Sequence, residues 1–142
     1  MEAAIAQGLT ELGLDAGKAP QLARYGRLLL EKNQVMNLTA ITDPDQVARL
    51  HMLDCAALLG CADLQSRSLI DVGTGAGFPG LVLKIMEPTL ELTLLDSLEK
   101  RLNWLAPVCA ELGLEGVRFV HARAEEGSLD PGLREQFDYA TA

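Results

Sequence analysis

The stretch Asp71-Val-Gly-Thr-Gly-Ala-Gly-Phe-Pro-Gly80 decides the fold class of this chain. It follows a short apolar run at 68–72 and precedes an apolar segment at 80–86 that Pro88 ends, which predicts a strand, a glycine turn and a helix. Glycines at alternate positions let a ligand approach the backbone, and the free amides at the start of the helix can bind an anionic group. The stretch therefore predicts a ligand site at a strand-to-helix turn.

The alternation of strands and helices continues toward the C-terminus. The predicted elements are a strand at 91–96, a helix at 97–113 with Ser97 as its cap, a strand at 117–121 and a fourth strand at 137–141. Pro107 lies inside that helix and predicts a kink, because it removes a backbone hydrogen bond. Near-continuous apolar strands between helices indicate an α/β fold with a parallel sheet covered on both faces.

The chain before this alternation, residues 1–64, has the pattern of helices. Two apolar stripes at helical spacing are formed by Ile5, Leu9 and Leu12 and by Leu22, Tyr25 and Leu29. A third helix is predicted from the cap Asp43 to Gly60. Because 142 residues suffice for one domain, we expect a single domain, 1–142, with a helical segment at 1–64 and half of a sheet at 65–142.

The charge, the hydropathy and the cysteine spacing of the chain argue against several classes of protein. The chain has 12 basic and 20 acidic residues, a formal net charge of −8, which disfavours non-specific binding to nucleic acid. No apolar run is long enough to span a membrane, so we expect a cytoplasmic protein. The three cysteines, Cys55, Cys61 and Cys109, are too widely spaced for a zinc cage or a disulfide framework. We expect buried thiols and no metal.

Asp96 closes the second predicted strand and indicates the kind of ligand. It follows Gly77 by 19 residues, near the ~20-residue offset at which a carboxylate binds ribose hydroxyls, so the ligand should contain adenosine. Two classes of ligand remain. Gly75-x-Gly77-x-x-Gly80 fits the pattern for NAD, but Asp71 at the mouth of the loop would repel a pyrophosphate and attract an ammonium group. These charges favour S-adenosylmethionine, which has an ammonium, a sulfonium and no phosphate.

The motifs together resemble a known family. The glycine stretch, then Leu94-Leu-Asp-Ser-Leu98 with Lys100-Arg101, then Arg123-Ala-Glu125, is similar to class I methyltransferases. More narrowly, the chain resembles the bacterial small-subunit ribosomal RNA guanine-N7 methyltransferases, also called the glucose-inhibited division protein B family. Asn37-Leu38-Thr39 and His51-Met52-Leu53-Asp54 agree with that family, so the resemblance covers nearly the whole chain. Cys55 departs from it, because the family usually has serine there.

The resemblance implies a Rossmann-like class I methyltransferase fold, S-adenosyl-L-methionine as cofactor, and methylation of guanine N7 in 16S ribosomal RNA. The partner would be 16S ribosomal RNA or the small ribosomal subunit, and the full-length protein would be a monomer. Since the family's sheet has seven strands, we expect a chain truncated after its fourth strand and inactive alone. The residues expected at the cofactor, from the motifs and the resemblance together, are Asp71, Gly73, Gly75, Gly77, Phe78, Asp96, Ser97, Leu98, Ala124 and Glu125.

No catalytic residue is expected, because guanine N7 has a lone pair and no proton, and its attack on a sulfonium methyl needs no general base. His121 is therefore predicted to be structural. His51 and Asp54 share a helical face and form either a structural pair or a group near the substrate. Two other functions stay open: a NAD-binding module, and a ribosome-associated domain without catalytic activity.

Overall fold

The computed structural model describes residues 1–133 and 136–142. The chain forms two compact units, Met1–Asp63 and Leu64–Ala142. The division falls next to the border predicted between the helical and the sheet segments. No helix in the described residues is long and apolar enough to cross a membrane.

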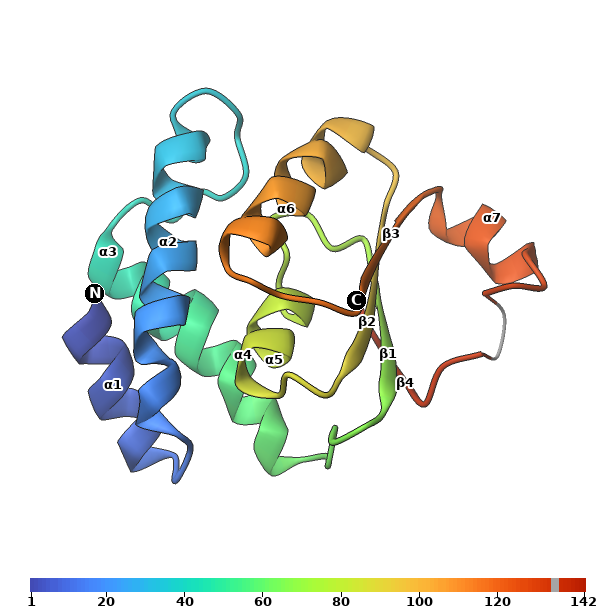
Figure 1. Cartoon of the computed structure of the whole chain (residues 1–142). Coiled ribbons are helices and arrows are strands. Elements are labelled where there is room, and N and C mark those ends of the chain that lie inside the picture. Colours follow the sequence, from blue (N-terminus) through green and yellow to red (C-terminus); the bar gives the residue numbers. More distant parts are fainter. Residues whose placement is uncertain (134–135) are drawn as a thin grey trace. The chain divides into compact units, whose positions relative to one another are not determined.

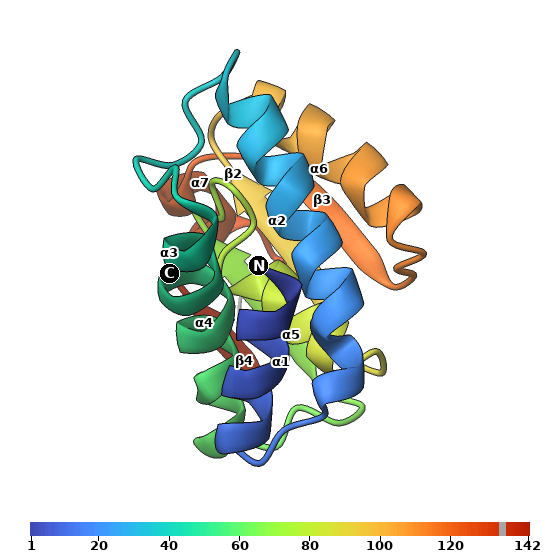
Figure 2. The ribbon, with the colours of Figure 1, turned by 90° about the vertical axis from the view of Figure 1, so that its left-hand side faces the viewer.

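The first unit contains only helices. In chain order these are α1 (Glu2–Glu11), η1 (Ala16–Lys18), α2 (Ala19–Asn33), and a continuous run made of α3 (Pro44–Gln46), the π-helical η2 (Val47–Leu53), α4 (Asp54–Ala56) and η3 (Ala57–Gly60). Figure 2 shows α1 beside α2. Both predicted stripes contribute to the core, except that Leu12 follows the end of α1 and is 45% exposed. The predicted cap is confirmed, since Asp43 Oδ2 accepts the amide of Gln46 at 3.1 Å.

The second unit contains a four-stranded parallel sheet in the order β3-β2-β1-β4. The strands are β1 (Ser68–Val72), β2 (Glu91–Asp96), β3 (Val117–His121) and β4 (Tyr139–Thr141). The first three match their predicted bounds, whereas β4 begins two residues later than predicted. The register places Asp71 beside Leu94 on β2 and beside Thr141 on β4. The predicted α/β class with a parallel sheet is confirmed.

Helices lie on both sides of this sheet (Figure 1). On one side, α5 (Gly80–Met86) packs on β1 and β2, and α6 (Glu99–Glu111) packs on β2 and β3. On the other side, α7 (Ala124–Leu129) lies near an apolar cluster of Ile70, Leu95 and Leu133. Among the described residues of the second unit, the two faces of the sheet are therefore covered unequally.

Two sequence expectations in these regions are wrong. Ser97 does not cap α6, which begins at Glu99 with Leu98 before it, although Gly113 follows its end with φ +68° as predicted. Cys109 is buried, but Cys55 is half-buried and Cys61 is exposed, because Cys61 lies just past the end of the helical run.

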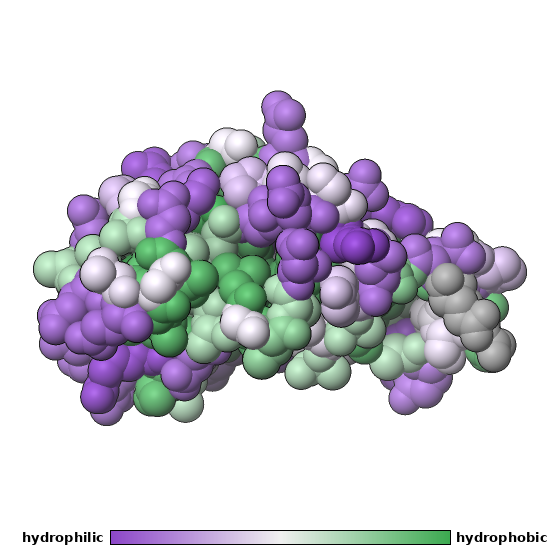
Figure 3. All heavy atoms as spheres, turned by 90° about the horizontal axis from the view of Figure 1, so that it is seen from below, coloured by the Kyte–Doolittle hydropathy of each residue, from purple (hydrophilic) through white to green (hydrophobic). Residues whose placement is uncertain are grey.

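Apolar groups also reach the surface between polar ones (Figure 3). In the second unit the large exposed ones are Leu98, Leu129 and Tyr139.

Candidate functional site

The glycine loop joins the end of β1 to the start of α5. The amides of Gly73 and Thr74 donate to the Leu95 carbonyl on β2 at 2.8 and 3.0 Å, which ties the loop to the neighbouring strand. Gly73, Gly75 and Gly77 have φ values of +70°, +57° and +100°. Residues with an L side chain rarely adopt this backbone conformation, so the loop requires glycine at these alternate positions.

Asp71 lies beneath the loop and is fully buried. Its Oδ2 accepts the Thr74 hydroxyl at 2.7 Å and the Gly80 amide at 3.0 Å, and its Oδ1 accepts the Thr141 hydroxyl at 3.0 Å. Burial raises the pKa of Asp71, and these three hydrogen bonds oppose that rise. The sequence placed Asp71 at the mouth of the loop. The structure instead makes it an internal support, and its contact with a ligand stays a prediction.

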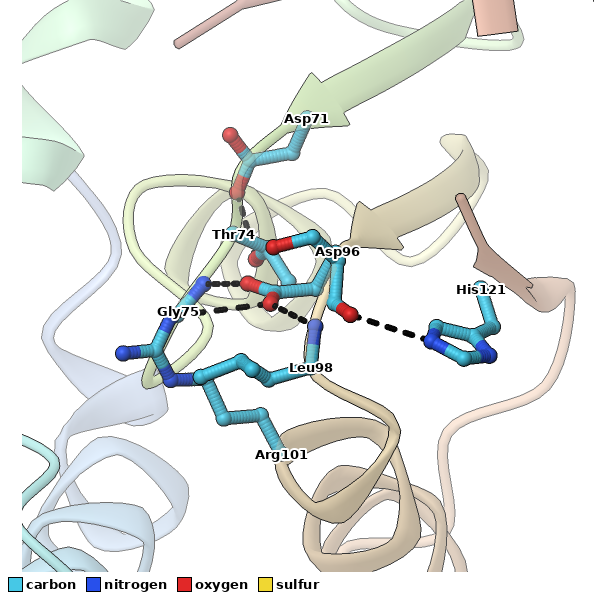
Figure 4. Close-up of polar contacts among 8 residues, drawn as sticks. Asp71, Thr74, Gly75, Asp96, Leu98, Arg101 and His121 are labelled. Atoms are coloured by element: carbon cyan, nitrogen blue, oxygen red, sulfur yellow. Dashed lines mark hydrogen bonds and ion pairs between the residues drawn. The ribbon is translucent and has the colours of Figure 1, made fainter. Parts of the chain in front are cut away.

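Asp96 connects the glycine loop to the turn after β2 (Figure 4). The residue is 1% exposed. Its Oδ2 accepts the Gly75 amide at 2.8 Å, and its Oδ1 accepts the Leu98 amide at 2.8 Å. Arg101, on the first turn of α6, places Nη1 3.5 Å from the same Oδ1. One buried carboxylate thus fixes the loop, the turn and a basic side chain.

A cavity of about 510 Å³ opens beside the loop and the turn. Its lining residues are Val72, Gly73, Leu95, Ser97, Ala122, Arg123, Ala124 and Glu125. Four predicted site residues, Gly73, Ser97, Ala124 and Glu125, therefore lie together. An apolar cavity of about 370 Å³ under α7 shares Val72, Leu95 and Ala124 with it.

The other predicted site residues are not among the residues that line this cavity. Gly75 and Leu98 hold Asp96 through their amides, whereas Gly77 is buried and Phe78 half-buried in the loop. Sequence reasoning assigned no role to Arg123, although it lines the cavity. The signal was present, because Arg123 directly precedes the predicted pair Ala124 and Glu125.

His121 and His51 both have defined partners. His121 Nε2 lies 3.0 Å from the Ser97 carbonyl, and because a carbonyl only accepts, the ring donates and holds the turn after β2. In the first unit, His51 Nε2 lies 2.8 Å from the Thr39 hydroxyl, and burial lowers the pKa of His51. Asp54 is exposed at the start of α4. In the described residues no group of three or more metal-binding side chains is found.

A parallel sheet with a glycine turn after β1 and a cavity at the carboxyl ends of its strands defines a Rossmann-like domain of the methyltransferase type. The profile of the family GidB, described as rRNA small subunit methyltransferase G, matches residues 18–142, and the chain belongs to this family. The family expected from the motifs is thus confirmed.

Proteins of several bacteria are similar in sequence to this chain. A protein of Alkaliphilus metalliredigens is 51% identical over 138 residues, which are 95% of this chain and 58% of the relative. One from Streptococcus thermophilus is 48% identical over 138 residues, 94% of this chain and 58% of the relative. One from Clostridium perfringens is 47% identical over 119 residues, which are 83% of this chain and 50% of the relative. All three are named ribosomal RNA small subunit methyltransferase G, and the matched part of this chain spans between 50% and 58% of their length.

Proposed function

We propose that this chain is the S-adenosylmethionine-binding part of an enzyme that methylates guanine N7 in 16S ribosomal RNA. The observation that carries the proposal is the cavity at the carboxyl ends of β1, β2 and β3, where four residues predicted at the cofactor lie together in a member of this family. We propose the small ribosomal subunit as the partner, the cytoplasm as the location, and a monomer as the full-length form.

The cavity suits an adenosine ligand in size and lining. Its volume of about 510 Å³ lies within the ~300–1,000 Å³ typical of ligand sites. Val72, Leu95 and Ala122 offer apolar surface for a base, while Ser97 and Glu125 offer polar groups for its edge. A Cβ added at Gly73 would meet nothing within 4 Å, so this side of the loop is open for close approach to the backbone.

The charges around the site are compatible with a cationic ligand. Two buried carboxylates, Asp71 and Asp96, lie under and beside the loop, and the cavity lining contains one acidic residue, Glu125, and one basic residue, Arg123. A pyrophosphate would approach these carboxylates at an electrostatic cost. This balance supports S-adenosylmethionine over NAD, whose fingerprint Gly75-x-Gly77-x-x-Gly80 nevertheless makes it the second candidate.

The bound cofactor would supply an electrophilic methyl group on its sulfonium. The chain's own residues then need to orient the cofactor rather than move a proton, because guanine N7 carries none. Alignment of two reactants supplies up to roughly 7–11 kcal/mol of the barrier reduction. The ring of His121 is engaged with the backbone of the turn, which agrees with a structural role for it.

Calorimetry with S-adenosylhomocysteine, S-adenosylmethionine and NAD tests the cofactor. We expect heat from the first two ligands only; heat from NAD alone would establish the dinucleotide alternative. The transfer step needs a second assay. In it, the chain and, in parallel, the full-length Alkaliphilus relative are incubated with S-adenosylmethionine and with small ribosomal subunits that lack N7-methylguanine. Mass spectrometry then detects N7-methylguanine. If the relative forms N7-methylguanine and this chain binds the cofactor without forming it, the chain is a binding domain without transfer activity of its own.

A further inference from the structure

We infer that Arg101 is a latch on the Asp96 carboxylate that must open before a ribose diol can bind there. The inference rests on the proposed function, since ribose is part of the proposed ligand. Arg101 acts through Asp96 and is therefore a positioning residue.

A carboxylate offers about four acceptor positions, two on each oxygen. In Asp96, Oδ2 accepts the Gly75 amide at 2.8 Å, while Oδ1 accepts the Leu98 amide at 2.8 Å and faces Arg101 Nη1 at 3.5 Å. Oδ1 is thus filled, and one position remains on Oδ2. Two neighbouring ribose hydroxyls need two positions if both are to donate, so one present partner has to leave.

The three partners differ in how easily they leave. The amides of Gly75 and Leu98 belong to the backbone of the loop and of the turn, so their movement would reshape the site. Arg101 makes the longest contact, and its side chain is 33% exposed. Its long flexible stem can carry the guanidinium into water. The group that a ribose displaces is therefore Arg101.

Displacement has a measurable signature. Opening the latch costs the free energy of a partly exposed ion pair, so Arg101→Gln should bind S-adenosylhomocysteine about two- to fivefold more tightly than the unchanged protein. This ligand has no net charge, which limits the effect of simply removing a positive charge from the protein. Salt screens ion pairs, so rising salt should tighten binding by the unchanged protein but not by Arg101→Gln.

The experiment is isothermal calorimetry on the whole chain with S-adenosylhomocysteine at low and high salt. Arg118→Gln, an exposed arginine on β3, is the matched control and should leave the affinity unchanged. In an Asp96→Asn background, Arg101→Gln should no longer tighten binding, which a merely structural role of Arg101 would not produce.

The outcomes separate the latch from the proposed function. If the unchanged protein does not bind S-adenosylhomocysteine, the proposed function fails. If it binds, and Arg101→Gln binds equally or more weakly, the latch is overturned. Should Arg101→Gln not fold, Arg101→Met keeps the apolar stem and allows the same comparison. The salt series on the unchanged protein is an independent test. Weaker or constant binding at high salt overturns the latch.

Discussion

A single methyl group at Gly80 tests whether Asp71 is the support of the glycine loop. Gly80 is the first residue of α5, and its amide donates to Asp71 Oδ2 at 3.0 Å. A Cβ built at Gly80 would lie 2.8 Å from that same oxygen, 3.0 Å from Asp71 Cβ and 3.0 Å from Leu94 Cδ2. All three atoms belong to buried residues, so Gly80→Ala forces the carboxylate, the leucine or the helix to shift.

The magnitude follows from two opposing effects. Adding a methyl group to a packed core costs about 1–3 kcal/mol. Replacing glycine by alanine in a helix returns roughly 0.5–1 kcal/mol, because the unfolded chain loses less entropy on folding. We therefore expect Gly80→Ala to lower the free energy of unfolding by about 1–2 kcal/mol, and to weaken cofactor binding because the loop moves with Asp71.

The assay is urea unfolding followed by the fluorescence of Trp104, the chain's one tryptophan, which lies in α6 of the same unit. Gly60→Ala, followed by circular dichroism, is the matched control, because a Cβ there would meet nothing within 4 Å. In an Asp71→Ala background the penalty of Gly80→Ala should shrink, since the nearest atom is gone. A Gly80→Ala protein as stable as the unchanged one would refute the packing that we describe around Asp71.

Four further predictions concern single side chains. Gly73→Val should abolish S-adenosylhomocysteine binding in calorimetry, because φ is +70° there and the branched side chain would fill the open approach to the backbone. Asp96→Ala should weaken that binding by roughly 1.5–3 kcal/mol, the range for hydrogen bonds to a charged group; unchanged affinity with an intact circular dichroism spectrum would remove Asp96 from the site. Lys84→Met should lower the free energy of unfolding by about 1–3 kcal/mol, because the buried ammonium donates to the carbonyls of Pro88 and Leu90, which would lose their partner. Burial lowers the pKa of His51 in the folded chain below 6.5, its ordinary value in the unfolded chain. Between these two pKa values the unfolded chain binds more protons, so thermal melts should show that stability is lost as the pH falls through this window. In His51→Gln, the melting temperature should depend less on pH.

The strands of the sheet could be predicted because their signals are local. β1, β2 and β3 are short apolar runs bounded by turn residues, and their ends agree with the sequence to the residue. β4 begins later than its apolar run, because Asp138 accepts the amide and the hydroxyl of Ser68, which fixes the chain just before the first paired residue. That contact joins residues 70 positions apart, and no local pattern contains it.

The turn after β2 shows the same limit in the site itself. Ser97 has the residue type and the position of a helix cap, yet α6 begins at Glu99. The Ser97 carbonyl is bound by His121 from β3, and the Leu98 amide is bound by Asp96, so the turn is already fixed by contacts that precede the helix. Local capping preference is worth only about 1 kcal/mol, and two such contacts can override it.

The glycines of the loop could be predicted from the sequence. For the two carboxylates that hold the loop, the sequence predicted a ligand role but not their hydrogen bonds to the backbone. Asp71 and Asp96 end or nearly end adjacent parallel strands, and the sequence assigned both to the ligand. The structure gives each one a backbone amide of the loop or of its helix: Gly80 for Asp71 and Gly75 for Asp96. The shape of the loop therefore depends on the register between β1 and β2. A change that shifts this register would alter the candidate site even where no lining residue is substituted, because Val72 and Leu95 of the lining lie on these two strands.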